Sequence, residues 1–118
     1  MSMAGKIWRP PTDVYETADA IVVRVEAAGM TEGDFSVELA RRVLVISGRR
    51  LDRGSSKIAY QQMEISYGDF RTEVHLFTPV NAAAVEATYR DGFLVVTLPK
   101  AGVLRVPVSD ISANKRPG

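Results

Sequence analysis

Very few side chains in the sequence have the type and the spacing that catalysis or metal binding requires. His75 is the single histidine of the chain, and one imidazole without neighbouring ligands cannot hold a metal ion, so we expect it to point into solvent. Glu64, Asp69 and Glu73 lie close together in the sequence, but paired carboxylates hydrolyse a glycosidic bond only across a cleft and with separated pKa values. We interpret them as the solvated face of a strand. The sequence therefore predicts no catalytic residue and no enzyme activity.

Composition excludes several other kinds of site. The chain has no cysteine, so it can form neither a disulfide nor a thiolate metal site, and an intracellular location follows more easily than an exported one. The sequence also lacks a glycine-rich phosphate loop of the dinucleotide or P-loop type. We therefore expect no metal and no cofactor.

Charge and hydropathy argue against nucleic acid and membranes as partners. The chain has 15 basic and 14 acidic residues, and the two signs are interspersed rather than gathered in one basic patch. Lys115 and Arg116 form a small basic pair near the end, which we interpret as part of a solvated tail. The sequence contains no run of about 18 apolar residues. We expect a soluble, unprocessed cytoplasmic protein.

The first half of the chain predicts three antiparallel strands. Residues 20–28, 35–40 and 43–48 each alternate apolar and polar side chains with a period of two, as expected for strands with one buried face. The second and third of these strands should pair as a hairpin. Ala40-Arg41 and the following arginine lack the glycine or asparagine that positive φ favours, so either the turn is longer than two residues or an arginine carries about 1 kcal/mol of strain. We favour the longer turn.

The second half of the chain predicts further strands and one clear hairpin. A short strand at 58–60 and a long strand at 63–77, interrupted by a glycine, precede a weakly helical segment at 81–87. Asp91-Gly92 then joins two alternating strands, and this residue pair is typical of a two-residue type I′ turn. Seven or eight short strands without a helical period predict one all-β domain, an antiparallel sandwich.

Several spaced motifs resemble the small heat-shock proteins and their alpha-crystallin domain. The motifs are WRPPTDVYETADAIVV, YGDF and, above all, ATYRDGFL, which fits the family signature A-x-x-x-D/N-G-hydrophobic-L. Together they cover about residues 8–108, nearly the whole chain. The resemblance implies an all-β, immunoglobulin-like antiparallel sandwich over residues 12–100, with a short N-terminal arm at 1–11 and a C-terminal extension at 101–118.

The resemblance also implies a function and a mode of assembly. Members of the family are ATP-independent holdases of the stress response, which capture unfolding client proteins before these aggregate. Members of the bacterial and plant type form homodimers by exchanging a short strand. The best match to that strand here is Ile58, Ala59 and Tyr60, which would pair with Val14 and Tyr15 of a second copy.

The same resemblance assigns a docking motif to the C-terminal extension. Val106 and Val108 fit the family pattern I/V-x-I/V, and Leu104 extends the same face. Pro107 favours an extended backbone at Val106, so the segment is suited to adding to an open sheet edge. The groove that receives it would be lined by Val37, Leu39, Val85 and Ala87. Docking onto a neighbouring dimer is favoured, and packing against the chain's own domain is the alternative.

The tail motif bears on an alternative function, and the N-terminal arm bears on the size of the assembly. A co-chaperone of the p23 type, or another interaction module, would share the sandwich but would not be expected to carry the tail motif. The arm offers Ile7 and Trp8 as bulky apolar side chains, and burying both contributes about 3–6 kcal/mol at most. We therefore expect a homodimer or a small assembly of dimers, with unfolded clients as the other partners.

Overall fold

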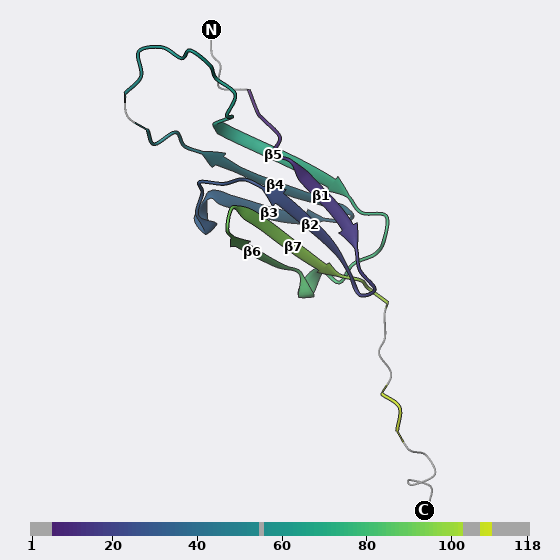
Figure 1. Ribbon diagram of the computed structural model, residues 1–118. Coiled ribbons are helices and arrows are strands. Elements are labelled where there is room, and N and C mark those ends of the chain that lie inside the picture. The colour runs from purple at the N-terminus through teal and green to yellow at the C-terminus, as the bar shows by residue number, and fades with distance from the viewer. Residues whose placement is uncertain (1–5, 55, 103–106, 110–118) are drawn as a thin grey trace, which may run out of the picture.

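The chain forms two antiparallel β-sheets that pack face to face (Figure 1). The computed structural model describes residues 6–54, 56–102 and 107–109. One sheet has the strand order β1-β2-β7-β6 and the other has the order β3-β4-β5. The elements are β1 (Thr12–Glu16), β2 (Ala20–Glu26), the 3-10 helix η1 (Glu32–Asp34), β3 (Phe35–Ala40), β4 (Val43–Arg50), β5 (Gly68–His75), the 3-10 helix η2 (Ala82–Ala84), β6 (Glu86–Arg90) and β7 (Phe93–Pro99). The all-β sandwich expected from the sequence is confirmed.

The core lies between the sheets and is built mainly from the inward side chains of β2, β4, β5 and β7. Along β2 the inward residues are at most 7% exposed, whereas Arg24 and Glu26 face solvent, so the predicted alternation is confirmed. Thr72 is a buried polar residue, and its hydroxyl hydrogen-bonds to that of Thr12 at 3.1 Å. The apolar core residues are Ile21, Val23, Val25, Ala27, Met30, Leu44, Ile46, Phe70, Val74, Leu76, Leu94, Val96 and Leu98.

The β6–β7 hairpin has the turn that its sequence predicts. Asp91 and Gly92 adopt positive φ values of 52° and 84°, which a type I′ turn requires. Arg90 and Phe93 form the pair that closes the hairpin. Because β7 also pairs with β2 on its other side, the hairpin makes β6 the outer strand of its sheet.

The β3–β4 turn is shorter than predicted. Ala40 pairs with Val43, so Arg41 and Arg42 form a two-residue turn and the prediction of a longer loop is wrong. Arg41 adopts φ 59°, a left-handed conformation that costs a non-glycine residue about 1–2 kcal/mol. Uninterrupted pairing of β3 with β4 holds this strained residue in place, because opening the turn would sacrifice ladder hydrogen bonds.

The β4–β5 connection, residues 51–67, contains no strand in its described part. The predicted strand at 58–60 is therefore wrong for the single chain, and the predicted strand at 63–77 begins only at Gly68. Among the described residues no strand pairs with this segment, and an unpaired strand is unstable in water. The connection is also longer than the usual loops of compact domains, and such loops are commonly functional.

The segment predicted to be weakly helical forms a single 3-10 turn, η2. The Asn81 side-chain oxygen accepts a hydrogen bond from the Ala83 N–H at 3.2 Å and caps the turn. The chain then enters β6 at Glu86. Within the described residues, neither helix approaches the length and hydropathy needed to cross a membrane.

The segment before β1 is docked on the edge of β5. Trp8 forms a parallel bridge with Phe70. The Trp8 N–H donates to the Asp69 carbonyl at 3.1 Å, and the Arg71 N–H donates to the Trp8 carbonyl at 3.0 Å. The Trp8 and Phe70 rings lie 5.4 Å apart, so this part of the arm is anchored to its own sandwich.

Replacing Arg41 with glycine is expected to raise the free energy of unfolding by about 0.5–1 kcal/mol, because glycine adopts positive φ without the Cβ clash. Urea denaturation followed by circular dichroism measures the change. Arg42→Gly is the matched control. Arg42 lacks positive φ, and its Nη1 donates to the Phe77 carbonyl at 3.4 Å, so this change should lower stability. If Arg41→Gly lowered the free energy of unfolding, the left-handed backbone of Arg41 would not be strained.

Candidate functional site

The side chains considered first for chemistry are exposed, and several form ion pairs. The His75 side chain is 68% exposed, as predicted, and its Nε2 lies 3.9 Å from the Glu73 carboxylate. Asp69 pairs with Arg49 at 3.5 Å, and Glu64 lies in the β4–β5 connection. Among the residues that the structure describes, no group of three or more acidic, histidine or cysteine side chains could hold a metal ion.

The outer strands of the two sheets are the more informative feature. β1 and β6 are the outer strands of one sheet, and β3 and β5 are those of the other. One side of each backbone has no partner strand within its sheet, so its N–H and C=O groups are open to solvent or to an added strand. The start of the β5 edge is occupied by Trp8. The sandwich therefore exposes several edges on which another extended segment could pair.

The four residues predicted to line a groove lie on or beside two outer strands. Val37 and Leu39 belong to β3, Val85 precedes β6, and Ala87 belongs to β6. The first three are half-buried against the core. Ala87 lies on the same side of β6 as Tyr89, which also packs against the core, yet Ala87 is exposed. The inward face of β6 is therefore apolar and incompletely covered at this position.

Tyr89 holds β6 close to β3 at one end of these strands. Its ring lies 5.0 Å from that of Phe35, the first residue of β3. Its hydroxyl donates to the Ala27 carbonyl at 2.7 Å and accepts from the Met30 N–H at 3.3 Å. Because the Tyr89 hydroxyl both donates and accepts a hydrogen bond, these bonds favour one arrangement of strand β6 relative to strand β3.

β1 and β5 meet on the opposite side of the sandwich, where Thr12 bonds to Thr72. Val14 and Tyr15, the predicted acceptors of an exchanged strand, are 49% and 44% exposed. Phe77, which follows β5, is 92% exposed. The sequence predicts Phe77 only as the last residue of a strand at 63–77, and it becomes an exposed site residue because β5 ends at His75. A cavity of about 220 Å³ lies here, lined by Val14, Tyr15, Glu16, Ile21, His75, Leu76, Phe77 and Thr78.

The predicted exchange segment lies in the β4–β5 connection, which stands clear of the sheets (Figure 1). Ile58 is fully exposed, its neighbour Ala59 is exposed, and Tyr60 is 48% exposed. The Asp52 carboxylate pairs with Lys57 Nζ at 2.8 Å and accepts a hydrogen bond from the Tyr60 hydroxyl at 3.2 Å. The hydrogen bond between Lys57 and Asp52 is the main reason why the pKa of Asp52 is lowered. The same hydrogen bond raises the pKa of Lys57. In the single chain the segment therefore contacts its own connection rather than β1.

The C-terminal extension leaves the sandwich from a fixed root. Lys100 follows β7, and its Nζ pairs with the Glu16 carboxylate of β1 at 2.6 Å. Of the three predicted docking residues, Leu104 and Val106 lie outside the described residues, and Val108 is 97% exposed. The structure thus fixes where the extension starts, and the described part of the motif has its apolar side chain in solvent.

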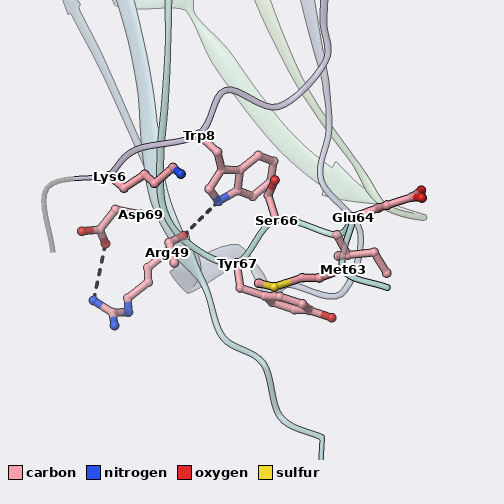
Figure 2. A pocket seen from close by; sticks show the side chains of 10 residues that line it. Lys6, Trp8, Arg49, Met63, Glu64, Ser66, Tyr67 and Asp69 are labelled. Atoms are coloured by element: carbon pink, nitrogen blue, oxygen red, sulfur yellow. Dashed lines mark hydrogen bonds and ion pairs between the residues drawn. The ribbon is translucent and has the colours of Figure 1, made fainter. Parts of the chain in front are cut away.

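A second hollow lies between the N-terminal segment and the end of the β4–β5 connection (Figure 2). The Trp8 indole N–H donates to the Gly68 carbonyl at 3.2 Å, and the Arg50 guanidinium lies over the Trp8 ring, 4.5 Å from its centroid. The role of Arg50 was not predicted from the sequence, because no local pattern indicates that an arginine at the end of a strand stacks on a ring far away in the sequence. The hollow measures about 480 Å³ and is lined by Lys6, Trp8, Arg49, Met63, Glu64, Ile65, Ser66, Tyr67, Gly68 and Asp69.

Comparisons of the sequence with known proteins match most of the chain. A sequence profile of the Hsp20/alpha crystallin family matches residues 13–112. A 17.0 kDa class II heat shock protein from Zea mays is 37% identical over 91 residues, covering 76% of this chain and 59% of that protein. A probable 15 kDa heat shock protein from Leptospira interrogans is 30% identical over 100 residues, covering 80% and 72%. The chain spans 60% of the length of small heat shock proteins C2 and C4 from Rickettsia felis, which are each 29% identical to it.

Solved structures share the sandwich. Heat shock protein 16.0 from Schizosaccharomyces pombe superposes with a TM-score of 0.73 at 28% identity, covering 86% of this chain and 96% of that one. A small heat-shock protein from Xylella fastidiosa with a distinct high order structure gives a TM-score of 0.73 at 25% identity, covering 89% and 100%. The similarity therefore extends over the whole two-sheet architecture.

Proposed function

The chain belongs to the Hsp20/alpha crystallin family of small heat-shock proteins, and from this premise we propose that it is an ATP-independent chaperone that holds unfolding proteins and prevents their aggregation. The observation that carries the proposal is the pair of outer strands β3 and β6, with inward apolar residues left partly or wholly exposed at Val37, Leu39 and Ala87. An extended apolar segment can pair with such an edge through its backbone and bury its side chains there. Binding of this kind needs no cofactor and no catalytic step.

The class of client follows from the chemistry of this surface. Its side chains are aliphatic, so it favours segments rich in aliphatic and aromatic residues, which folded proteins bury and unfolding proteins expose. Each fully buried client side chain contributes about 1.5–3 kcal/mol, so a few of them give reversible binding with little sequence preference. The proposal includes a cytoplasmic location, which the absence of cysteine supports.

We also propose that two copies form a dimer by exchanging residues 57–62 onto β1. The exposed side chains of Ile58 and Tyr60, on a connection without a strand of its own, support exchange because they have apolar surface to bury. β1 has an open edge, and Val14 and Tyr15 beside it are half-exposed. Pairing with the partner's segment would satisfy this edge in both copies.

The C-terminal extension would occupy the β3–β6 edges of a neighbouring dimer when no client is bound. The exposed Val108 and the root fixed by Lys100 support this role, since the root holds the start of the extension while the valine remains free to dock. Client and extension would then compete for the same strands. Because Trp8 is docked on its own sandwich, its bulky side chain is not available to join chains, and we propose a dimer or a small assembly of dimers.

Chaperone activity is tested by light scattering of a heat-labile enzyme at 45 °C, with this protein and without ATP. Suppression of aggregation at about equimolar chains is expected for the wild type. Ala87→Glu should weaken suppression several-fold, because it places a charge on the apolar inward face of β6. Thr88→Glu adds the same charge on the outward face of the same strand and should act like the wild type. No suppression by the wild-type protein would contradict the proposed function.

Strand exchange is tested by replacing Ile58 and Tyr60 together with glutamate. The double variant should be monomeric in sedimentation velocity, because two charges cannot be buried against β1 without a cost of several kcal/mol. Ser55→Glu combined with Ser56→Glu adds equal charge at polar positions of the same connection, outside the exchanged residues, and should leave the dimer intact. An unchanged dimer mass in the first variant would point to a different interface.

Docking of the extension is tested by Val106→Asp combined with Val108→Asp. The variant should release dimers from any larger assembly, seen by size-exclusion chromatography with light scattering, and should keep the thermal midpoint of the wild type. Ser109→Asp with Ser112→Asp is the control of equal charge. A fall in the midpoint as large as that of the core substitution Leu94→Ala would show instead that the motif packs against its own domain.

A further inference from the structure

Arg50 joins three segments that are far apart in the sequence. It is the last residue of β4, and its Nε and Nη2 donate to the Ser66 carbonyl at 3.0 and 2.7 Å. Its Nη1 donates to the Ala28 carbonyl, between β2 and η1, at 3.2 Å. The guanidinium also lies over the Tyr67 ring, with 5.5 Å to the centroid. One side chain thus ties the first end of the β4–β5 connection to its last residues.

Trp8 covers the same guanidinium from the side of the N-terminal segment. The Arg50 head group lies 4.5 Å from the centroid of the Trp8 ring, a distance at which a cation and an indole face attract each other. The indole N–H donates to the Gly68 carbonyl at 3.2 Å, and the Trp8 backbone bonds to Asp69 and Arg71. Figure 2 shows Trp8 beside Ser66 and Tyr67, at the end of the connection.

These contacts fix both ends of the connection at one place. Arg50 pairs with Gly68 as the last pair of the β4–β5 ladder. The hydrogen bonds from the Arg50 side chain to the Ser66 carbonyl hold the two ends of the connection together beyond this pair. Farther along the connection, the Asp52 carboxylate bonds to Lys57 and to Tyr60, which lie in the connection itself. The connection therefore projects from a rigid base.

We propose that Trp8 and Arg50 are positioning residues for strand exchange. They hold the base of the connection in the direction from which residues 57–62 reach the β1 strand of a second copy. The inference rests on the strand-exchange dimer proposed above. A segment that starts from a fixed base loses less conformational entropy when it binds, so the dimer is tighter than it would be with a loose base. The N-terminal segment thus promotes dimer formation through contacts of Trp8 with Arg50 and Gly68 of its own chain.

The experiment measures the dimer dissociation constant of the full chain by sedimentation velocity over a dilution series. Trp8→Ala and Arg50→Met should each raise this constant about tenfold, since each removes a cation–π contact and at least one hydrogen bond. The double variant should be weakened by less than the sum of the two single effects, because the two residues contact each other and hold the same base of the connection. Trp8→Phe keeps a ring under Arg50 and should recover most of the affinity. Ile7→Ala, at a neighbouring position that is 55% exposed, is the control and should match the wild type.

Hydrogen exchange separates positioning from general stability. In Trp8→Ala the amides of residues 8 and 71, which bond between the N-terminal segment and β5, should exchange at least about fivefold faster, while the central strands β2 and β7 keep their protection. An unchanged dissociation constant in Trp8→Ala, or equal loss of protection throughout the sandwich, would overturn the inference. If the variant with glutamate at positions 58 and 60 stays dimeric, residues 57–62 do not form the dimer interface, and the positioning role of Trp8 and Arg50 is then overturned as well. If that variant is monomeric but Trp8→Ala dimerises normally, only the positioning role is overturned.

Discussion

Backbone hydrogen bonding stops at the outer strand of each sheet, and this constraint governs the rest of the structure. The described residues build sheets of four and three strands, and in this part of the chain the outer strands β1, β6, β3 and β5 each keep one side of their backbone without a partner in the sheet. Such groups must bond to water, to a loop or to another extended chain. Trp8 shows how the chain itself meets this need, since it bonds to the first part of the β5 edge. The remaining edges are where another extended chain can pair with the sandwich.

The hydrophobic core stabilises the sandwich even though the outer edges of the sheets have no partner strand among the described residues. The central strands β2, β7 and β4 carry side chains that are completely buried, such as Val23, Val96 and Leu44, and burial of this kind is the main favourable term in folding. Of the outer strands, β5 also supplies buried residues such as Phe70, whereas β3 contributes less, since Val37 and Leu39 are only half-buried. A sandwich stabilised from its centre keeps its fold while its periphery offers apolar surface. That division suits a protein whose proposed partners are unfolding chains of no fixed sequence.

Two long cationic side chains mark the places where the segments outside the sheets begin. Arg50 closes the base of the β4–β5 connection through the Ser66 carbonyl, and Lys100, whose side chain is 15% exposed, fixes the root of the C-terminal extension through Glu16. Both bury their stems and use the charged head to bond oxygen atoms. The connection and the extension leave from opposite ends of the sandwich (Figure 1). Segments suited to contact other molecules therefore start from fixed points, and proposed assembly at one end need not obstruct the other.

The sequence by itself determined the features that depend on consecutive residues. The alternation of Ile21, Val23 and Val25 identified β2 and its buried face, and Asp91-Gly92 identified the type I′ turn, because side-chain period and tolerance of positive φ are local properties. The motifs also identified the family. Only the tertiary structure decided the left-handed Arg41, the absence of a strand at 58–60, and the bonds from Tyr89 to Ala27 and from Trp8 to Gly68, which span 62 and 60 residues. These features depend on which edges meet across the two sheets, and no local pattern encodes a contact that forms only after distant strands have packed.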